Sequence, residues 1–251
     1  MDKNKNLTIK ETFGRAVKNH QEGKTDIAQD LYNQILKIDP NHSSAHNNLG
    51  VIFQGLGENQ QAKECYEKVI TINPNNMKAH NNLGLTFKEL GENQKAKDCF
   101  EKSIEINPNY SQAHNNLGLT FNELRENQKA KDCYEKAIAI NPDYADAHNN
   151  LGVIFQELGE NQKAKDYYEK AIKINPNDIN VLNNLGLTFK ELGEYQKAKD
   201  CYEKAILIDP NNISSINALS FLLELHRFNY KSEGDKTSFK KLIISLHKSS
   251  F

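Results

Sequence analysis

Proline recurs at a fixed interval along this chain of 251 residues. Each proline follows the previous one by 34 residues, and the six are Pro40, Pro74, Pro108, Pro142, Pro176 and Pro210. A period of this length, kept without an insertion, indicates a short unit that cannot bury its apolar face alone and stacks on its neighbours. The sequence therefore predicts one elongated array of repeats. We expect its function on the stacked surface rather than in a catalytic pocket.

Each unit contains two apolar patterns with helical spacing. In unit 79–112 the first pattern covers 79–90 and stops at Gly91, a residue that suits the left-handed turn after a helix. The second pattern covers 96–106 and stops before Pro108, because a proline disfavours helical geometry in the residue before it. The unit is therefore predicted to contain a first helix, which we call helix A, a tight turn and a second helix, helix B.

Two further positions of the unit carry small or polar residues. A glycine inside helix A costs up to about 1 kcal/mol relative to alanine, so its recurrence predicts a close crossing of two helices. These glycines are Gly50, Gly84, Gly118, Gly152 and Gly186. After each proline comes an asparagine or aspartate, which we expect to cap the next helix A. Those residues are Asn41, Asn75, Asn109, Asp143, Asn177 and Asn211.

The small residue in helix A, an alanine twelve residues later, an aromatic residue and the closing proline recur in register. The alanines are Ala62, Ala96, Ala130, Ala164 and Ala198. This combination resembles the tetratricopeptide repeat family, strongly over 45–214 and more weakly over 11–44 and 215–225. The resemblance implies an all-α fold: a right-handed superhelical solenoid of antiparallel helix pairs with a C-terminal capping helix. Arg125 departs from the pattern at a turn glycine, where a left-handed conformation costs roughly 1 to 2 kcal/mol, so we expect that turn to be distorted.

The repeat register divides the chain into three parts. Residues 1–10 are predicted to be an N-terminal extension, 11–214 six repeats, and 215–251 a partial repeat with a capping segment. The six repeats are 11–44, 45–78, 79–112, 113–146, 147–180 and 181–214. The last part carries apolar residues on one helical face, and we expect them to cap the stack, because an open stack exposes apolar surface at its end. They are Phe239, Leu242, Ile243 and Leu246.

The charge balance gives no reason to expect nucleic acid or an anionic membrane as a partner. Lys and Arg number 32 against 33 Asp and Glu, which leaves a formal net charge of -1. No stretch approaches the roughly 18 apolar residues of a membrane-spanning helix, and the chain starts without the apolar core of a secretory signal. We therefore expect a cytoplasmic protein with no membrane span. The segment 226–251 is basic, which leaves contact with a membrane surface or an acidic partner open.

Helix A carries a pair of asparagines on the side that core packing does not use. The second asparagines of the pairs are Asn48, Asn82, Asn116, Asn150 and Asn184, and the first are Asn47, Asn81, Asn115, Asn149 and Asn183. An asparagine amide offers both donors and an acceptor, so a row of them can bind the backbone of an extended peptide. The second asparagine resembles the asparagine ladder in the repeats of O-linked N-acetylglucosamine transferases. That resemblance implies peptide contact by the second asparagines first and the first asparagines next. The alternative is that these residues only solvate a groove.

Three other sets of residues favour packing over chemistry. Cysteines at one repeat position stand about 8 to 10 Å apart, beyond the roughly 7 Å that a disulfide tolerates, so we expect free thiols. They are Cys65, Cys99, Cys133 and Cys201. The histidines also occur once per repeat, so several of them cannot lie about 2.1 Å from one shared zinc ion. These histidines are His46, His80, His114 and His148. Lys88 and Lys190 are followed by glutamates, which disfavours a clamp for a peptide carboxylate. We expect no metal and no cofactor.

The sequence contains no Gly-rich phosphate loop, nucleophile elbow, HExxH or CxxC motif, so we expect no catalytic residue and no enzyme activity. We expect a scaffold for protein interactions that holds an extended peptide or partner segment in the concave groove lined by helix A asparagines. The alternative is the substrate-recruiting repeat module of a glycosyltransferase, similar to O-linked N-acetylglucosamine transferase, whose catalytic domain is not in this chain. A third class is self-association through the ends of the array.

Overall fold

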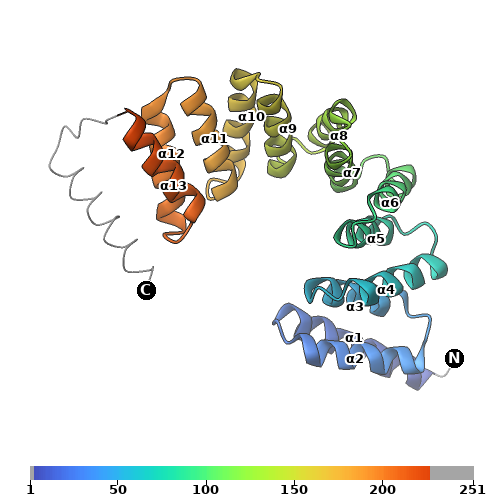
Figure 1. Ribbon diagram of the computed structural model, residues 1–251. Coiled ribbons are helices and arrows are strands. Elements are labelled where there is room, and N and C mark those ends of the chain that lie inside the picture. The colour runs from blue at the N-terminus through green and yellow to red at the C-terminus, as the bar shows by residue number, and fades with distance from the viewer. Residues whose placement is uncertain (1–2, 227–251) are drawn as a thin grey trace. The chain divides into compact units, whose positions relative to one another are not determined.

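The structure is a computed structural model that describes residues 3–226. This part of the chain forms thirteen α-helices and no strand (Figure 1). The helices are α1 (Lys3–Gln21), α2 (Thr25–Ile38), α3 (Ser43–Gly55), α4 (Asn59–Ile72), α5 (Met77–Glu89), α6 (Asn93–Ile106), α7 (Ser111–Glu123), α8 (Asn127–Ile140), α9 (Ala145–Glu157), α10 (Asn161–Ile174), α11 (Ile179–Glu191), α12 (Tyr195–Ile208) and α13 (Ile213–His226). Consecutive helices pack in pairs, so the expected all-α fold of helix pairs is confirmed.

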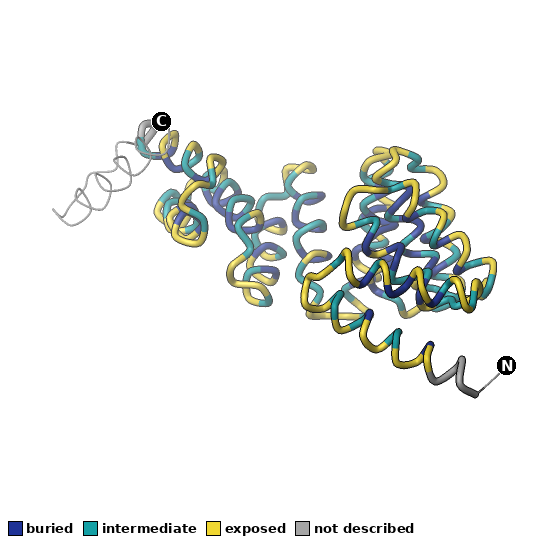
Figure 2. The backbone as a smooth tube through the Cα atoms, turned by 90° about the horizontal axis from the view of Figure 1, so that it is seen from below, coloured by how far each residue is buried: buried dark blue, intermediate teal, exposed yellow. Residues whose placement is uncertain are grey.

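The chain divides into two compact units, Met1–Ile140 and Asn141–Phe251. The first unit holds four helix pairs, from α1 with α2 to α7 with α8. The second holds the pairs α9 with α10 and α11 with α12, followed by α13. Buried residues line the sides of the helices that face their neighbours within a unit, as Figure 2 shows in dark blue. None of the helices in the described part of the chain is long and apolar enough to cross a bilayer.

The glycine of helix A lies under an aromatic ring of helix B. A Cβ atom added to Gly84 would lie 2.6 Å from a ring carbon of Phe100, which is closer than two carbon atoms approach without a clash. The same relation joins Gly50 to Tyr66, Gly118 to Tyr134, Gly152 to Tyr168 and Gly186 to Tyr202. The predicted close helix crossing is therefore confirmed, because the missing side chain provides the space that the ring occupies.

The expected capping of helix A by the residue after the proline is wrong. Helix α5 is capped by Asn76, whose side chain accepts a hydrogen bond from the Ala79 N–H at 3.1 Å. Asn75 is exposed, and its own N–H donates to the Asn73 side chain two residues earlier, at 3.2 Å. The same bond recurs at Asn41, Asn109, Asp143 and Asn211. The proline holds Asn73 in an extended conformation, which places the side chain of that residue over the turn and shifts the cap by one position.

Arg125 has a φ of 60°, in the left-handed region that glycines with φ of 73 to 77° occupy at the other described turns. Its N–H donates to the Asn122 carbonyl at 3.0 Å, as Gly91 donates to Lys88 at 2.8 Å. Helix α7 also ends at Glu123, the residue equivalent to the last residue of α5. The expected distortion of this turn is therefore not observed, and the arginine adopts the conformation that the turn requires.

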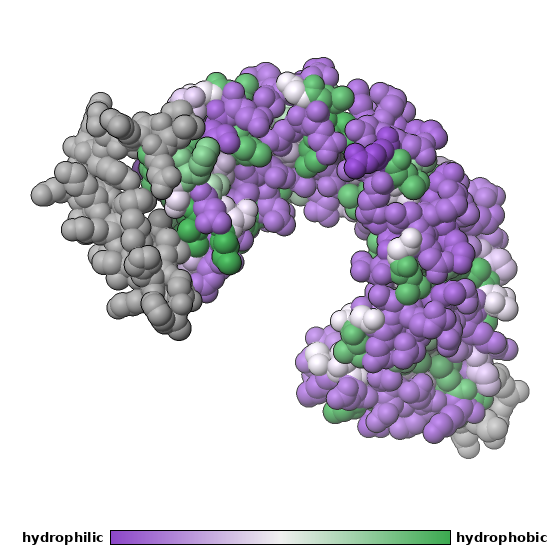
Figure 3. Space-filling view, in the orientation of Figure 1, coloured by the Kyte–Doolittle hydropathy of each residue, from purple (hydrophilic) through white to green (hydrophobic). Residues whose placement is uncertain are grey.

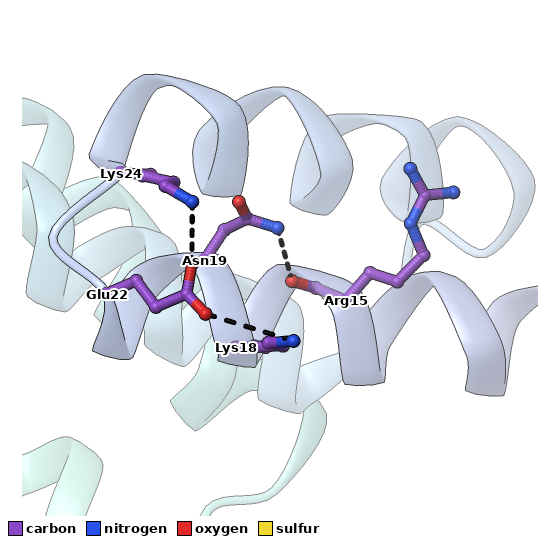
Figure 4. Close-up of polar contacts among 5 residues, drawn as sticks. All are labelled: Arg15, Lys18, Asn19, Glu22 and Lys24. Carbon is purple, nitrogen blue, oxygen red and sulfur yellow. Dashed lines mark hydrogen bonds and ion pairs between the residues drawn. The ribbon is translucent and has the colours of Figure 1, made fainter.

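The first helix begins at Lys3, eight residues before the predicted start of the first repeat at residue 11. At its C-terminal end the Asn19 side chain donates to the Arg15 carbonyl at 2.8 Å, and Glu22 forms ion pairs with Lys24 at 2.7 Å and Lys18 at 3.9 Å (Figure 4). The predicted capping residues of 239–246 and the basic segment after His226 lie outside the described residues, so the predicted division of the chain into three parts stays a prediction.

Candidate functional site

The asparagine pairs lie on helices α3, α5 and α7 of the first unit and on α9 and α11 of the second. Three of these asparagines are buried: Asn81, Asn115 and Asn116 expose only 4%, 3% and 9% of their surface. The others are half-buried, and they are Asn47, Asn48, Asn82, Asn149, Asn150, Asn183 and Asn184. Asn81, Asn115 and Asn116 therefore do more than solvate the surface, because a buried amide needs hydrogen-bond partners inside the protein.

Amide hydrogen bonds join successive A helices. The Asn116 Nδ2 of α7 donates to the Asn81 Oδ1 of α5 at 2.9 Å. In the second unit the Asn184 Nδ2 of α11 donates in the same way to the Asn149 Oδ1 of α9 at 3.1 Å. The Ser215 hydroxyl of α13 donates to the Asn183 Oδ1 at 2.8 Å. The first asparagine of these pairs thus accepts a bond from the following repeat, which gives it a structural role that the sequence did not reveal.

In the first unit the bond from Asn116 to Asn81 is part of a longer series of hydrogen bonds, in which each side chain donates to the next. Asn81 donates to the Asn82 Oδ1 across a longer distance of 3.5 Å. Asn82 donates to the Tyr66 hydroxyl, and that hydroxyl donates to the Gln54 Oε1 at 3.2 Å. Together with the bond from Asn116, the series connects helices α7, α5, α4 and α3. Neighbouring hydrogen bonds of this kind polarise and strengthen one another.

The tyrosine hydroxyls of helix B form hydrogen bonds with polar side chains of the A helices. The sequence analysis did not predict this role. Tyr32 accepts a hydrogen bond of 2.9 Å from the Asn48 Nδ2, and Tyr168 donates to the Gln156 Oε1 at 2.8 Å. Burial raises the pKa of the phenols of Tyr66, Tyr168 and Tyr202, the last to about 12. They are therefore neutral at physiological pH. The signal in the sequence is a tyrosine at one repeat position in every complete repeat except the third, where Phe100 replaces it.

An aliphatic residue stands three positions after the second asparagine of each pair. Val51 exposes 39% of its surface, and the equivalent residues are half-buried: Leu85, Leu119, Val153 and Leu187. Figure 3 shows that the visible surface is mainly hydrophilic and that apolar residues gather in small, separate areas. The A-helix face therefore combines amide groups with isolated aliphatic side chains, a combination suited to backbone hydrogen bonds and shallow apolar contacts.

The lysines of this face already have partners. The Lys88 Nζ lies 2.8 Å from the Glu123 Oε1 of the next A helix. The Lys190 Nζ lies 5.4 Å from the centre of the Phe221 ring, within the range of a cation–π contact. The ion pair of Lys88 argues against a carboxylate clamp, since a ligand carboxylate would compete with Glu123.

The cysteines and histidines occupy packing positions. All four cysteines are free and half-buried, and burial raises the pKa of the Cys65 thiol to about 11 and those of Cys99, Cys133 and Cys201 to about 12. Each histidine Nε2 lies 2.9 Å from the carbonyl of the proline six residues earlier, as His80 does with Pro74. Among the residues that the structure describes, no group of three His, Cys, Asp or Glu side chains could hold a metal ion.

Comparison with known proteins supports the repeat fold. The family model described as the cilia and flagella-associated protein 70 C-terminal domain matches residues 9–233. Among solved structures the chain is similar to PilF of Pseudomonas aeruginosa, with a TM-score of 0.76 at 20% identity over 87% of this chain and 100% of that one. No curated protein matches.

Two further solved structures are similar over shorter parts of the chain. MamA has a TM-score of 0.57 at 29% identity over 63% of this chain and 93% of that chain. YrrB, described as a TPR protein with an unusual peptide-binding site, has a TM-score of 0.56 at 18% identity over 75% of this chain and 97% of that chain. At the identities of PilF and YrrB, the likeness concerns the fold.

Proposed function

Because this chain belongs to the cilia and flagella-associated protein 70 C-terminal domain family of tetratricopeptide repeats, we propose that it is a scaffold for protein interactions. Its A-helix face binds an extended peptide or a segment of a partner protein. The chain carries out no catalysis, and it acts in the cytoplasm. The peptide-binding site of the repeat protein YrrB, which has a similar fold, supports a peptide as the kind of ligand.

The observation that carries this proposal is the remaining hydrogen-bonding capacity of Asn48, one of the half-buried second asparagines. Asn48 donates one N–H to Tyr32 and accepts one bond from Asn47. An amide has two N–H groups and two lone pairs, so one of each is left for the backbone of a ligand. The exposed Val51 lies one helical turn further along the same helix. A peptide bound here gains hydrogen bonds to its backbone and an aliphatic contact for one side chain.

The burial of individual asparagines changes the order of the candidate contact residues. We propose Asn48, Asn82, Asn150 and Asn184 as peptide contacts, because all four are half-buried second asparagines. Asn116 was expected among them, but only 9% of it is exposed and its amide bonds to Asn81. We propose that Asn116 and the first asparagines Asn81, Asn115 and Asn149 support the face. The first asparagines Asn47 and Asn183 are proposed as secondary contacts.

The experiment that tests this proposal compares Asn48→Ala/Asn82→Ala with the wild-type chain on an array of synthetic peptides that cover neutral and charged sequences. Removing two ligand-binding amides should weaken binding about tenfold or more, since each hydrogen bond contributes about 0.5 to 1.5 kcal/mol. The matched control is Asn75→Ala/Asn109→Ala, which removes two exposed amides from the loops. Equal peptide binding by both double variants, with unchanged circular dichroism, would refute the assignment of the face.

The glycosyltransferase alternative rests on the resemblance of the asparagine row alone. The bonds between Asn116 and Asn81 and between Asn184 and Asn149 give that row a structural role of its own. Those bonds remove the need for a shared glycosyltransferase function to explain it. The scaffold function is therefore the better supported of the two.

A further inference from the structure

The asparagine-bearing helices of the second unit carry an excess of negative charge. Helices α9 and α11 hold the carboxylates of Asp146, Glu157 and Glu191 against one lysine, Lys190, which gives a formal net charge of -2 with histidine neutral. Helices α3, α5 and α7, which carry the asparagine pairs of the first unit, are neutral, because two lysines balance two glutamates. The A-helix face of the second unit therefore favours a cationic ligand.

Two of these carboxylates lie at equivalent ends of neighbouring helices. Glu157 is the last residue of α9, Glu191 is the last residue of α11, and both are exposed. Helix α9 contacts α11 directly, and the Tyr168 hydroxyl donates to the Gln156 Oε1 beside Glu157 at 2.8 Å. Burial raises the pKa of the Tyr168 phenol, and the negative charges of Glu157 and Glu191 raise it further. Both carboxylates therefore lie near one neutral hydroxyl.

The first unit shows which group occupies the equivalent place. Glu89 and Glu123 end helices α5 and α7 as Glu157 and Glu191 end α9 and α11. There the Lys88 ammonium, one residue before Glu89, lies 2.8 Å from the Glu123 Oε1, and only 15% of the lysine side chain is exposed. An ammonium group thus fits between the ends of two successive A helices.

The second unit does not supply this ammonium from its own side chains. The residue equivalent to Lys88 is Gln156, which carries no charge. The Lys190 Nζ lies over the Phe221 ring of α13, 5.4 Å from its centre. Among residues 3–226, neither Glu157 nor Glu191 forms an ion pair. The two carboxylates are therefore available to a cation from a ligand.

We infer that Glu157 and Glu191 together bind the ammonium group of a lysine side chain in the bound peptide. This inference rests on the proposed peptide binding and adds a chemical preference to it, namely a lysine at one position of the ligand. The ammonium takes the place between α9 and α11 that Lys88 takes between α5 and α7. It has three N–H donors, so a single lysine can bond to both carboxylates.

An array of synthetic peptides tests the preference. Each peptide with one lysine is paired with the same peptide carrying norleucine, which keeps an unbranched side chain and removes the charge. The wild-type chain should bind the lysine form of its ligands about three- to tenfold more tightly, because each ion pair at an exposed position contributes modestly. In Glu157→Gln/Glu191→Gln this ratio should fall to about one, since no carboxylate remains. Binding of the norleucine form should not change.

A matched control removes two carboxylates elsewhere. Glu135→Gln/Glu169→Gln changes the net charge by the same amount at two exposed positions of the B helices α8 and α10. This control should keep the wild-type ratio of lysine to norleucine binding. A ratio that falls equally in both double variants would assign the preference to net charge and reject the carboxylate pair.

The opposite substitution supplies the cation from the chain itself. Gln156→Lys reproduces the arrangement of Lys88 and Glu123, and its ammonium should occupy the carboxylates. The ratio of lysine to norleucine binding should again fall to about one, although both carboxylates are retained. An unchanged ratio, with the same circular dichroism as the wild-type chain, contradicts the inferred position of the ammonium.

The outcomes separate this inference from the proposed function. Equal binding of the lysine and norleucine forms by the wild-type chain rejects the lysine site and leaves peptide binding in place. Failure of the wild-type chain to bind any peptide of either form rejects both. A carbodiimide cross-link locates the contact, since a bound lysine peptide should be joined to Glu157 or Glu191. Cross-links confined to other carboxylates overturn the assignment.

Discussion

The side chain of Asn116 donates a hydrogen bond of 2.9 Å to Asn81, 35 positions earlier in the chain. Both residues are buried, so the bond ties helices α5 and α7 together at a place that is largely shielded from solvent. Helix pairs within a repeat are held mainly by apolar packing. The A helices α5 and α7 are linked by this amide contact, and the stability of the protein should respond to its loss.

Replacing Asn81 by alanine should lower the free energy of unfolding by about 1 to 3 kcal/mol, because the buried Asn116 N–H loses its acceptor. Urea unfolding followed by circular dichroism measures the change. Asn177→Ala is the matched control, since that asparagine is exposed in a proline loop. If both variants unfold at the same urea concentration, the amide bond does not stabilise the stack.

Gly84→Ala should be destabilising by about 1 to 3 kcal/mol, because the new Cβ would displace the Phe100 ring from a packed interior. The matched substitution is Gly55→Ala in α3, where nothing lies within 4 Å of the added atom. There the better helix propensity of alanine should give a gain of up to about 1 kcal/mol. Thermal unfolding should therefore move in opposite directions for the two variants. A shift of the same sign in both would show that helix propensity outweighs the ring contact.

Arg125→Gly should stabilise the protein by about 0.5 to 1 kcal/mol, since glycine adopts positive φ without the steric cost that arginine carries. The reciprocal change, Gly91→Arg, should destabilise it by a similar amount, because Gly91 has a φ of 74°. The melting temperatures of the two variants, each compared with that of the wild type, measure these changes. A decrease for Arg125→Gly would mean that the arginine side chain makes contacts worth more than the backbone strain.

The thiols should make the protein less stable in alkali. The pKa of Cys99 is raised by burial from its ordinary value of 9.0 to about 12 in the folded protein. The unfolded chain therefore loses this proton at lower pH than the folded one does, and the associated stability, complete below pH 9, disappears as pH rises towards 12. Unfolding free energies measured across this interval should fall less steeply for Cys99→Ala. Identical slopes for the variant and the wild type would contradict the burial of this thiol.

Much of the fold follows from the sequence because its determinants are local or periodic. The prolines, the turn glycines and the apolar spacing predict the helix pairs, and the glycine at positions such as 84 predicts the close crossing. The helix caps were assigned one residue too early: the residue after the proline donates its own N–H to the side chain before the proline, and the next residue, Asn76 in α5, accepts the N–H of the helix. Arg125 shows that the backbone of a tight turn, set by its hydrogen bonds, prevails over the preference of a single residue.

The candidate site was harder to predict, because its character depends on contacts between repeats. The sequence shows that Asn81 and Asn116 are polar residues on helix A, but not that the neighbouring A helix approaches closely enough to bury them. The partners of the tyrosine hydroxyls depend in the same way on the spacing between helices. At Phe100 the hydroxyl is absent, and the Asn116 of the next repeat donates to Asn81. A periodic pattern thus specifies positions but not which neighbouring groups bind each other.

In five repeats a Cβ atom added to the helix A glycine would lie at nearly the same distance, 2.6 or 2.7 Å, from the ring of helix B. The contact between the two helices of a repeat is therefore equivalent in these five repeats. Excision of residues 79–112 would place Ala113 after Lys78 and leave the repeats on both sides with their own ring and glycine intact. A gene that encodes such a chain can lengthen or shorten the protein by whole repeats through unequal recombination, and each remaining repeat keeps its own contact between ring and glycine.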